Sequence, residues 1–189
     1  MDLKHPAVEA MRKRYLVKVR RRIRLLIVPH AASQYSGLAS HIAFASAARQ
    51  KRRRDRIVLL CTRHSSAPGL LQVAGPDAMP VTPEHHREHA YTNQLSFLTQ
   101  YFPNVPHIAF LVGPMTPDAR SAAVRMIDAL VTRRTLLIVS GDFMHVNGHF
   151  KHAVPKQWRR DMSSYTKSIE MDYVRLLANL PAATDDAFM

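Results

Sequence analysis

The sequence predicts an α/β fold with a central, mostly parallel sheet that is covered by helices on both faces. Four short runs are mostly apolar and rich in leucine or β-branched residues, as expected for strands buried on both faces. These runs alternate with segments whose apolar residues recur at helical spacing, which favours β-α-β units. Three of the runs end in a polar turn that carries a histidine. This pattern predicts a ligand site at the edge of the sheet where the strands end.

The first half of the chain predicts two strands and one helix. Residues 23–28 form the first strand, which Pro29 ends, and a small, polar loop follows over 30–37. Apolar residues at helical spacing predict a helix over 38–50, and residues 56–60 form the second strand. The stretch 62–83 is rich in Ser, Pro and Gly and is expected to be irregular.

The second half continues the alternation. A helix is expected over 84–101, and a strand over 107–112 is ended by Gly113 and Pro114. Thr116 followed by Pro117 is typical of a helix start, and that helix should run to about residue 132. The last predicted elements are a strand over 135–139 and a helix over 158–179.

Length and composition favour one α/β domain, residues 23–189, preceded by a basic arm, residues 1–22. No apolar run approaches the roughly 20 residues that span a bilayer, so no membrane span is expected. The single cysteine excludes an internal disulfide and suits a reducing compartment. We therefore predict a cytoplasmic protein, with a mitochondrial location as the alternative. The arm is as rich in arginine as an organelle transit peptide, although Asp2, Glu9 and the scarcity of serine argue against one.

The net charge is unusual, with 27 Lys and Arg residues against 14 acidic residues, which gives +13 and an isoelectric point near 10.6. Much of the excess lies in segments 12–24 and 51–56, which favours an anionic partner such as nucleic acid or another polyanion. The alternative is a solvated basic surface. The candidate polyanion-binding residues are Arg20, Arg21, Arg22, Lys51, Arg52, Arg53 and Arg54.

Histidines follow three of the predicted strands: His30, His64 and His145. If these strands are parallel neighbours, the imidazoles converge beyond their carboxyl ends, where α/β proteins bind ligands. Convergent imidazoles predict a metal site or an acid/base site. Asp142 lies three residues before His145 and would orient it as a general base; alternatively, Asp142 caps the local backbone.

Several motifs resemble those of the Memo family. Residues 27–31, 35–39 and 41–43 read IVPHA, YSGLA and HIA, and are similar to the opening motifs of that family. Further similarities, in the same order as in the family, are RIVLLCTRH at 56–64, EH at 88–89, IAFLVG at 108–113, LIVSGDFMH at 137–145 and SIE at 168–170. The resemblance covers roughly residues 23–180.

This resemblance implies the α/β fold that Memo proteins share with class III extradiol dioxygenases, together with a site for iron or copper. The metal ligands would be His30 and His64, with His145 and Asp142 as catalytic residues and His89 and Tyr35 lining the substrate crevice. The family takes its third ligand from a later cysteine motif. We therefore expect the third ligand not to be present in this chain, and the missing part to leave a sheet edge where a protein partner would dock.

Two functional hypotheses follow. In the first, the chain is a Memo-like metal-binding protein; if it is an enzyme, its activity is that of a metal-dependent, dioxygenase-like oxidoreductase. In the second, it is a non-catalytic, basic structural subunit that binds RNA or another polyanionic assembly, for example an organellar ribosome. Metal stoichiometry and salt-dependent binding to a polyanion distinguish these hypotheses.

Overall fold

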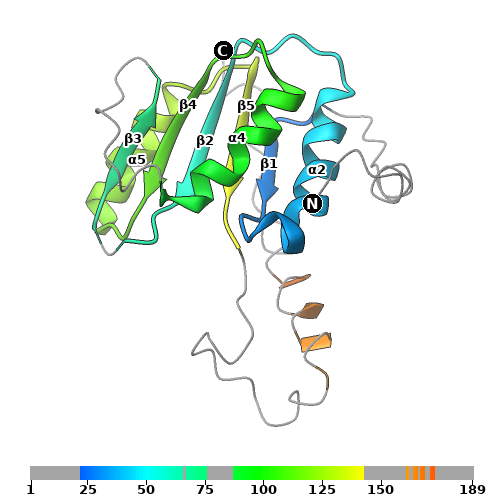
Figure 1. The fold of residues 1–189 in the computed structure, drawn as a ribbon. Coiled ribbons are helices and arrows are strands. Elements are labelled where there is room, and N and C mark those ends of the chain that lie inside the picture. Colours follow the sequence, from blue (N-terminus) through cyan, green and yellow to red (C-terminus); the bar gives the residue numbers. More distant parts are fainter. Residues whose placement is uncertain are drawn as a thin grey trace. The chain divides into compact units, whose positions relative to one another are not determined.

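The computed structural model describes residues 22–65, 67–75 and 87–142, together with 161, 164–165, 167–168 and 171–172 (Figure 1). The chain divides into two compact units, Met1–Gly141 and Asp142–Met189. In the second unit, residues 164–165, 167–168 and 171–172 are helical, and they fall within the helix predicted over 158–179. Every strand described below belongs to the first unit.

The first unit is built on a five-stranded sheet in the order β1-β5-β2-β4-β3 (Figure 1). Strands β1, β5, β2 and β4 are parallel, and β3 pairs with β4 in the antiparallel direction. The bounds are β1 Leu25–Val28, β2 Arg56–Thr62, β3 Leu70–Ala74, β4 His107–Val112 and β5 Thr135–Ser140. The predicted α/β fold with a mostly parallel sheet is confirmed. In the described sheet β1 and β3 are the outer strands, and a protein partner at a sheet edge stays a prediction.

Helices α2, Ser33–Ala48, and α4, His89–Tyr101, pack against each other on one face of the sheet, and α5, Pro117–Asp128, lies on the other (Figure 1). This division follows from the handedness of parallel crossovers. The connection from β1 to β2 contains α2, and the connection from β2 to β4 contains α4; both lead across the sheet in the same direction. The connection from β4 to β5 contains α5 and leads back in the opposite direction. Right-handed crossovers therefore place α5 on the face opposite α2 and α4.

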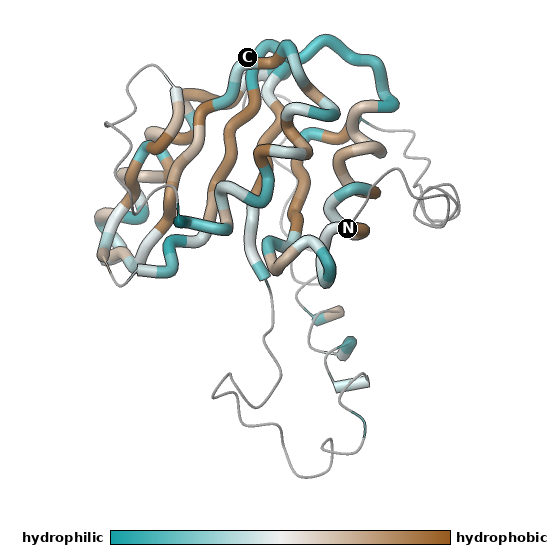
Figure 2. Tube along the Cα trace, in the orientation of Figure 1, coloured by the Kyte–Doolittle hydropathy of each residue, from teal (hydrophilic) through white to brown (hydrophobic). Residues whose placement is uncertain are grey.

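The core lies between the sheet and the pair α2 and α4, where the strands are continuously apolar (Figure 2). Phe44 of α2 is fully buried and stacks on Phe97 of α4 with ring centroids 5.3 Å apart. Leu59, Leu136 and Ile138 are also fully buried. These contacts fix α4 against the sheet, and thereby fix the position of the first residue of α4.

Helix α5 begins as the sequence predicts. The Thr116 hydroxyl oxygen accepts a hydrogen bond from the Ala119 N–H at 3.3 Å, and Pro117 occupies the first turn. The helix ends at Asp128, a few residues before the predicted end. Of the α5 residues, only Ala123 is buried, so most of the helix surface is exposed to solvent.

Two elements differ from the expectation. Helix α2 begins at Ser33, inside the stretch predicted to be a loop, and the Ser36 hydroxyl donates to the Ala31 carbonyl at 2.7 Å near its start. Strand β3 lies within the stretch predicted to be irregular. Gly69 and Gly75, with φ of 88° and 114°, bracket β3 and turn the chain at each end of this short strand.

Within the described residues, no helix combines the length and the apolar character that crossing a bilayer requires.

Candidate metal centre

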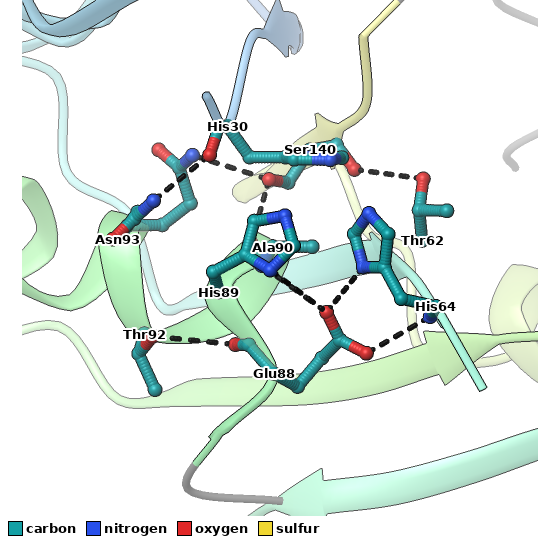
Figure 3. Close-up of polar contacts among 10 residues, drawn as sticks. His30, Thr62, His64, Glu88, His89, Ala90, Thr92, Asn93 and Ser140 are labelled. Carbon is teal, nitrogen blue, oxygen red and sulfur yellow. Dashed lines mark hydrogen bonds and ion pairs between the residues drawn. The ribbon is translucent and has the colours of Figure 1, made fainter. Parts of the chain in front are cut away.

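Three histidines from three separate elements meet at the carboxyl edge of the parallel strands (Figure 3). His30 lies two residues beyond β1, His64 lies two residues beyond β2, and His89 is the first residue of α4. Each offers a ring nitrogen, and these nitrogens lie within 4.8 Å of one another. The sheet register explains why His30 and His64 lie close together. Ser140 of β5 pairs with Val28 of β1 on one side and with Cys61 of β2 on the other, so β1 and β2 end at the same height in the sheet.

The rings are arranged in two ways. His64 and His89 stack, with centroids 4.0 Å apart and an interplanar angle of 29°. His30 stands edge-on to both, at 5.0 Å from His64 and 5.2 Å from His89. His30 is 2% exposed, whereas His64 and His89 are open to solvent. The cluster therefore has one buried donor and two accessible donors.

The donor set fits a divalent transition metal ion. Imidazole is a good ligand for iron, copper and zinc. With metal–nitrogen bonds of about 2.0–2.1 Å, adjacent tetrahedral ligand atoms lie about 3.4 Å apart, so small side-chain rotations would bring the nitrogens into range. Three protein ligands leave at least one coordination position open, which is typical of a catalytic rather than a structural metal site.

Glu88 fixes His64 through two hydrogen bonds (Figure 3). Its Oε1 lies 2.5 Å from His64 Nδ1, and its Oε2 accepts from the His64 backbone N–H at 2.9 Å. When Nδ1 carries the proton, Nε2 of His64 is left as the lone-pair donor, the arrangement found where a carboxylate supports a metal-bound histidine. Oε1 also accepts from the Ala90 N–H at 3.3 Å, which caps α4.

The same contacts keep Glu88 ionised. Burial raises the pKa of the Glu88 carboxyl, but the hydrogen bonds and charge of His64, with the Ala90 N–H, outweigh burial, so the pKa lies below its ordinary value. The side chain is 8% exposed. A buried carboxylate at this position supplies negative charge directly behind the imidazoles and favours a bound cation.

A buried polar network holds the backbone around the cluster. The Ser140 hydroxyl donates to the Ala90 carbonyl at 2.6 Å and accepts from the Gln94 side-chain amide at 3.1 Å. Gln94 also donates to the Pro29 carbonyl at 3.1 Å, and Asn93 donates to the His30 carbonyl at 2.8 Å. These bonds tie the start of α4 to β5 and to the turn after β1, so that His89 and His30 are held in register.

A cavity of about 190 Å³ opens beside His64 and His89. Its lining combines two of the histidines with two arginines: Arg63, His64, Ser65, Arg87, Glu88, His89 and Leu111. Because the Glu88 carboxylate is engaged by His64 and Ala90, Arg63 and Arg87 dominate the charge at the mouth. The cavity is therefore suited to a small anionic ligand.

The structure brings the predicted ligands His30 and His64 together and adds His89, which the sequence analysis placed in the substrate crevice. We expected no third ligand in this chain, and the structure differs because packing of α4 carries His89 to the strand ends. Tyr35 lies on α2, is 80% exposed and is not among the residues that line the cavity. His145 lies outside the described residues, and Asp142 begins the second unit.

Cys61 of β2 is fully buried beneath this edge. Burial raises the pKa of the thiol, and the negative charge of Glu88 raises it further. The thiol therefore stays protonated at neutral pH, whereas a cysteine that binds metal does so as the thiolate.

Two contributions were missed in the sequence. Glu88 was identified within the EH motif without a role, and Arg63 and Arg87 were not considered. The available signal for Glu88 was its position immediately before His89, which was predicted to line the substrate crevice; its role as the cap of α4 became visible only with the observed start of that helix.

The candidate polyanion-binding residues lie elsewhere. Arg22 precedes β1, and Lys51, Arg52, Arg53 and Arg54 form the connection between α2 and β2, whereas Arg20 and Arg21 lie outside the described residues. Lys51, Arg52 and Arg53 are exposed, and Arg54 is buried.

In comparisons with known proteins, no protein-family model matches the chain, and no curated protein sequence matches it.

Proposed function

We propose that this chain binds iron or copper through His30, His64 and His89 and acts as a metal-dependent, dioxygenase-like oxidoreductase. The observation that carries the proposal is the convergence of three imidazole nitrogens within 4.8 Å, backed by the buried carboxylate of Glu88. The resemblance of the surrounding motifs to the Memo family supports the same chemistry.

The proposed roles follow from the contacts. His30, His64 and His89 would hold the metal, and Glu88 would keep His64 in the tautomer that donates through Nε2. A bound iron or copper ion would supply redox chemistry at its open coordination positions. Arg63 and Arg87 would attract an anionic substrate, a carboxylate or a phosphate, into the cavity beside the metal.

Reconstitution with Fe(II) under anaerobic conditions, followed by exposure to air, tests the proposed activity. We expect dioxygen uptake in proportion to the bound iron in the unmodified chain. His89→Ala should retain no iron and consume no dioxygen above the buffer control. His107→Gln removes an imidazole outside the cluster and should behave like the unmodified chain. If the chain binds iron but consumes no dioxygen, the proposed oxidoreductase activity is refuted and only the proposal of metal binding stands.

The substrate class is tested with Cu(II) as a spectroscopic probe. Acetate or phosphate added to the Cu(II)-loaded chain should change its electron paramagnetic resonance spectrum at lower concentration than in Arg63→Gln/Arg87→Gln. The matched control, Arg120→Gln/Arg125→Gln, removes the same charge from exposed positions of α5. Equal anion sensitivity in all three proteins would contradict a role for Arg63 and Arg87.

A further inference from the structure

Arginines gather at the edge of the sheet opposite the histidines. Arg24 directly precedes β1, Arg134 directly precedes β5, and Arg54 lies two residues before β2. These strands are neighbours, and hydrogen bonds join them near their amino ends: the Leu137 N–H donates to the Arg24 carbonyl at 2.9 Å, and the Asp55 N–H donates to the Arg134 carbonyl at 3.2 Å. We call the following set the basic edge: Arg22, Arg24, Arg52, Arg54 and Arg134.

The members of the basic edge are close enough to repel one another. Burial lowers the pKa of Arg22, and the positive charges of Arg52, Arg24 and Arg134 lower it further, opposed by the carboxylate of Asp55. The cluster combines residues 22 and 24 with residues from two segments that lie far away in the sequence. The fold, rather than local sequence, brings these charges together.

Arg54 is a buried cation within the basic edge. It is 7% exposed, and one guanidinium nitrogen, Nη2, donates to the Ile23 carbonyl at 2.9 Å. The other, Nη1, is buried and has no hydrogen-bond partner among the described residues. Burial, and then the charge of Arg22, lowers the pKa of Arg54 to about 10. A buried cation without a countercharge is costly, so an anion held at this edge would stabilise the folded chain.

The three segments that carry the basic edge contain little countercharge of their own. In segments 22–24, 49–56 and 133–134, Asp55 is the one acidic residue. It contacts Arg53 at 3.2 Å and Arg134 at 3.5 Å, and both pairs are exposed. Exposed ion pairs of this kind contribute little, so Asp55 leaves Arg53 and Arg134 accessible to an anionic partner.

We infer that the basic edge binds the phosphate backbone of a nucleic acid. Guanidinium groups pair with phosphate oxygens through two parallel hydrogen bonds, and the pairing of neighbouring strands gathers the arginines at one end of the sheet. A nucleic acid fits this set because its backbone presents closely spaced phosphates, each with a negative charge.

The basic edge is expected to contact phosphates rather than to stack on bases. Segments 22–24, 49–56 and 133–134 contain no aromatic residue on which a base would stack. Figure 2 shows the connection between α2 and β2 as a hydrophilic stretch at the end of the sheet from which β2 starts. Affinity should therefore come from phosphate contacts and fall steeply with salt.

This site is separate from the candidate metal centre. Arg24 and His30 flank opposite ends of β1, roughly 20 Å apart at about 3.3 Å per extended residue. Loss of either function should leave the other unchanged, so failure of one proposal is distinguishable from failure of the other.

The test is fluorescence anisotropy of the full chain with labelled single-stranded RNA, and with DNA of the same sequence, over a range of salt concentrations. Arg52→Gln/Arg134→Gln alters two exposed members of the basic edge. Each lost phosphate contact should reduce the slope of log affinity against log salt by about 0.7, so we expect a reduction of about 1.4 and roughly 20-fold weaker binding at 0.1 M salt. The control is Arg120→Gln/Arg125→Gln on α5, which should keep the original slope.

Thermal unfolding of both double variants establishes that they are folded. Three results would overturn the inference: no binding of RNA or DNA even at low salt, an unchanged slope in Arg52→Gln/Arg134→Gln, or an equal loss of slope in the control variant. A preference for RNA over DNA, or the reverse, would support the inference and identify which nucleic acid the basic edge binds.

Discussion

His64 Nδ1 lies 2.5 Å from Glu88 Oε1, and the backbone N–H of the same histidine donates to Glu88 Oε2 at 2.9 Å. The carboxylate thus holds both the ring and the main chain of a residue that belongs to the three-histidine cluster. This double contact makes Glu88 the residue that links the start of α4 to the end of β2.

Glu88→Gln should weaken metal binding without abolishing it. The amide removes the negative charge behind His64, and loss of such a supporting group typically costs 10–100-fold in metal affinity. Competition titration with a chromophoric chelator measures the affinity. Asp118→Asn, the same charge change on exposed α5, serves as the control. An unchanged affinity in Glu88→Gln would show that the carboxylate acts only as a helix cap.

Phe44→Ala should destabilise the first unit by about 3–5 kcal/mol, because it removes a fully buried ring that stacks on Phe97. Urea unfolding followed by circular dichroism measures the change. Tyr35→Ala removes an aromatic ring from the same helix at a position that is 80% exposed, and its effect should stay within about 0.5 kcal/mol. Equal effects of the two substitutions would contradict the described packing of α2.

Cys61 should be unreactive in the folded chain. Its side chain is fully buried, and burial followed by the charge of Glu88 raises the pKa of its thiol, so the reactive thiolate is rare at neutral pH. An aromatic disulfide reagent should modify it only after denaturation, when the single cysteine of the sequence becomes accessible. Fast modification of the folded chain would contradict the placement of β2.

His107 should make the chain less stable on mild acidification. Burial lowers the pKa of His107 below its ordinary value of 6.5, so the unfolded chain binds more protons than the folded chain just below that pH. Stability is then fully present above pH 6.5 and decreases as the pH falls from there toward the lowered pKa. His107→Gln should show a smaller decrease between pH 7 and pH 5 in urea unfolding. An unchanged pH dependence would refute this role.

The sequence predicted the strands best where an apolar run had no competing signal, as in β2, β4 and β5. Strand β3 was missed because its five residues lie between glycines in a stretch rich in Ser and Pro, where turn signals dominate. The start of α2 was missed because Ser33 and Ser36 are typical of loops, and tertiary packing with local hydrogen bonds overrides that preference.

The candidate site was predictable in part. His30 and His64 could be proposed because each follows a strand, and parallel strand ends meet at one edge. His89 as a third donor depends on how α4 packs against α2 and the sheet, which no local pattern reveals. The same holds for the basic edge, where Arg24 and Arg134 become neighbours only through the pairing of β1 with β5.

Elemental analysis of the purified chain tests the central claim most directly, with His30→Ala, His64→Ala and His89→Ala measured beside His107→Gln. The three-histidine centre predicts close to one iron or copper per unmodified chain and per His107→Gln chain, and loss of the metal in each of the other three variants. Absence of bound metal after reconstitution, or metal retained when His89 is removed, would contradict it.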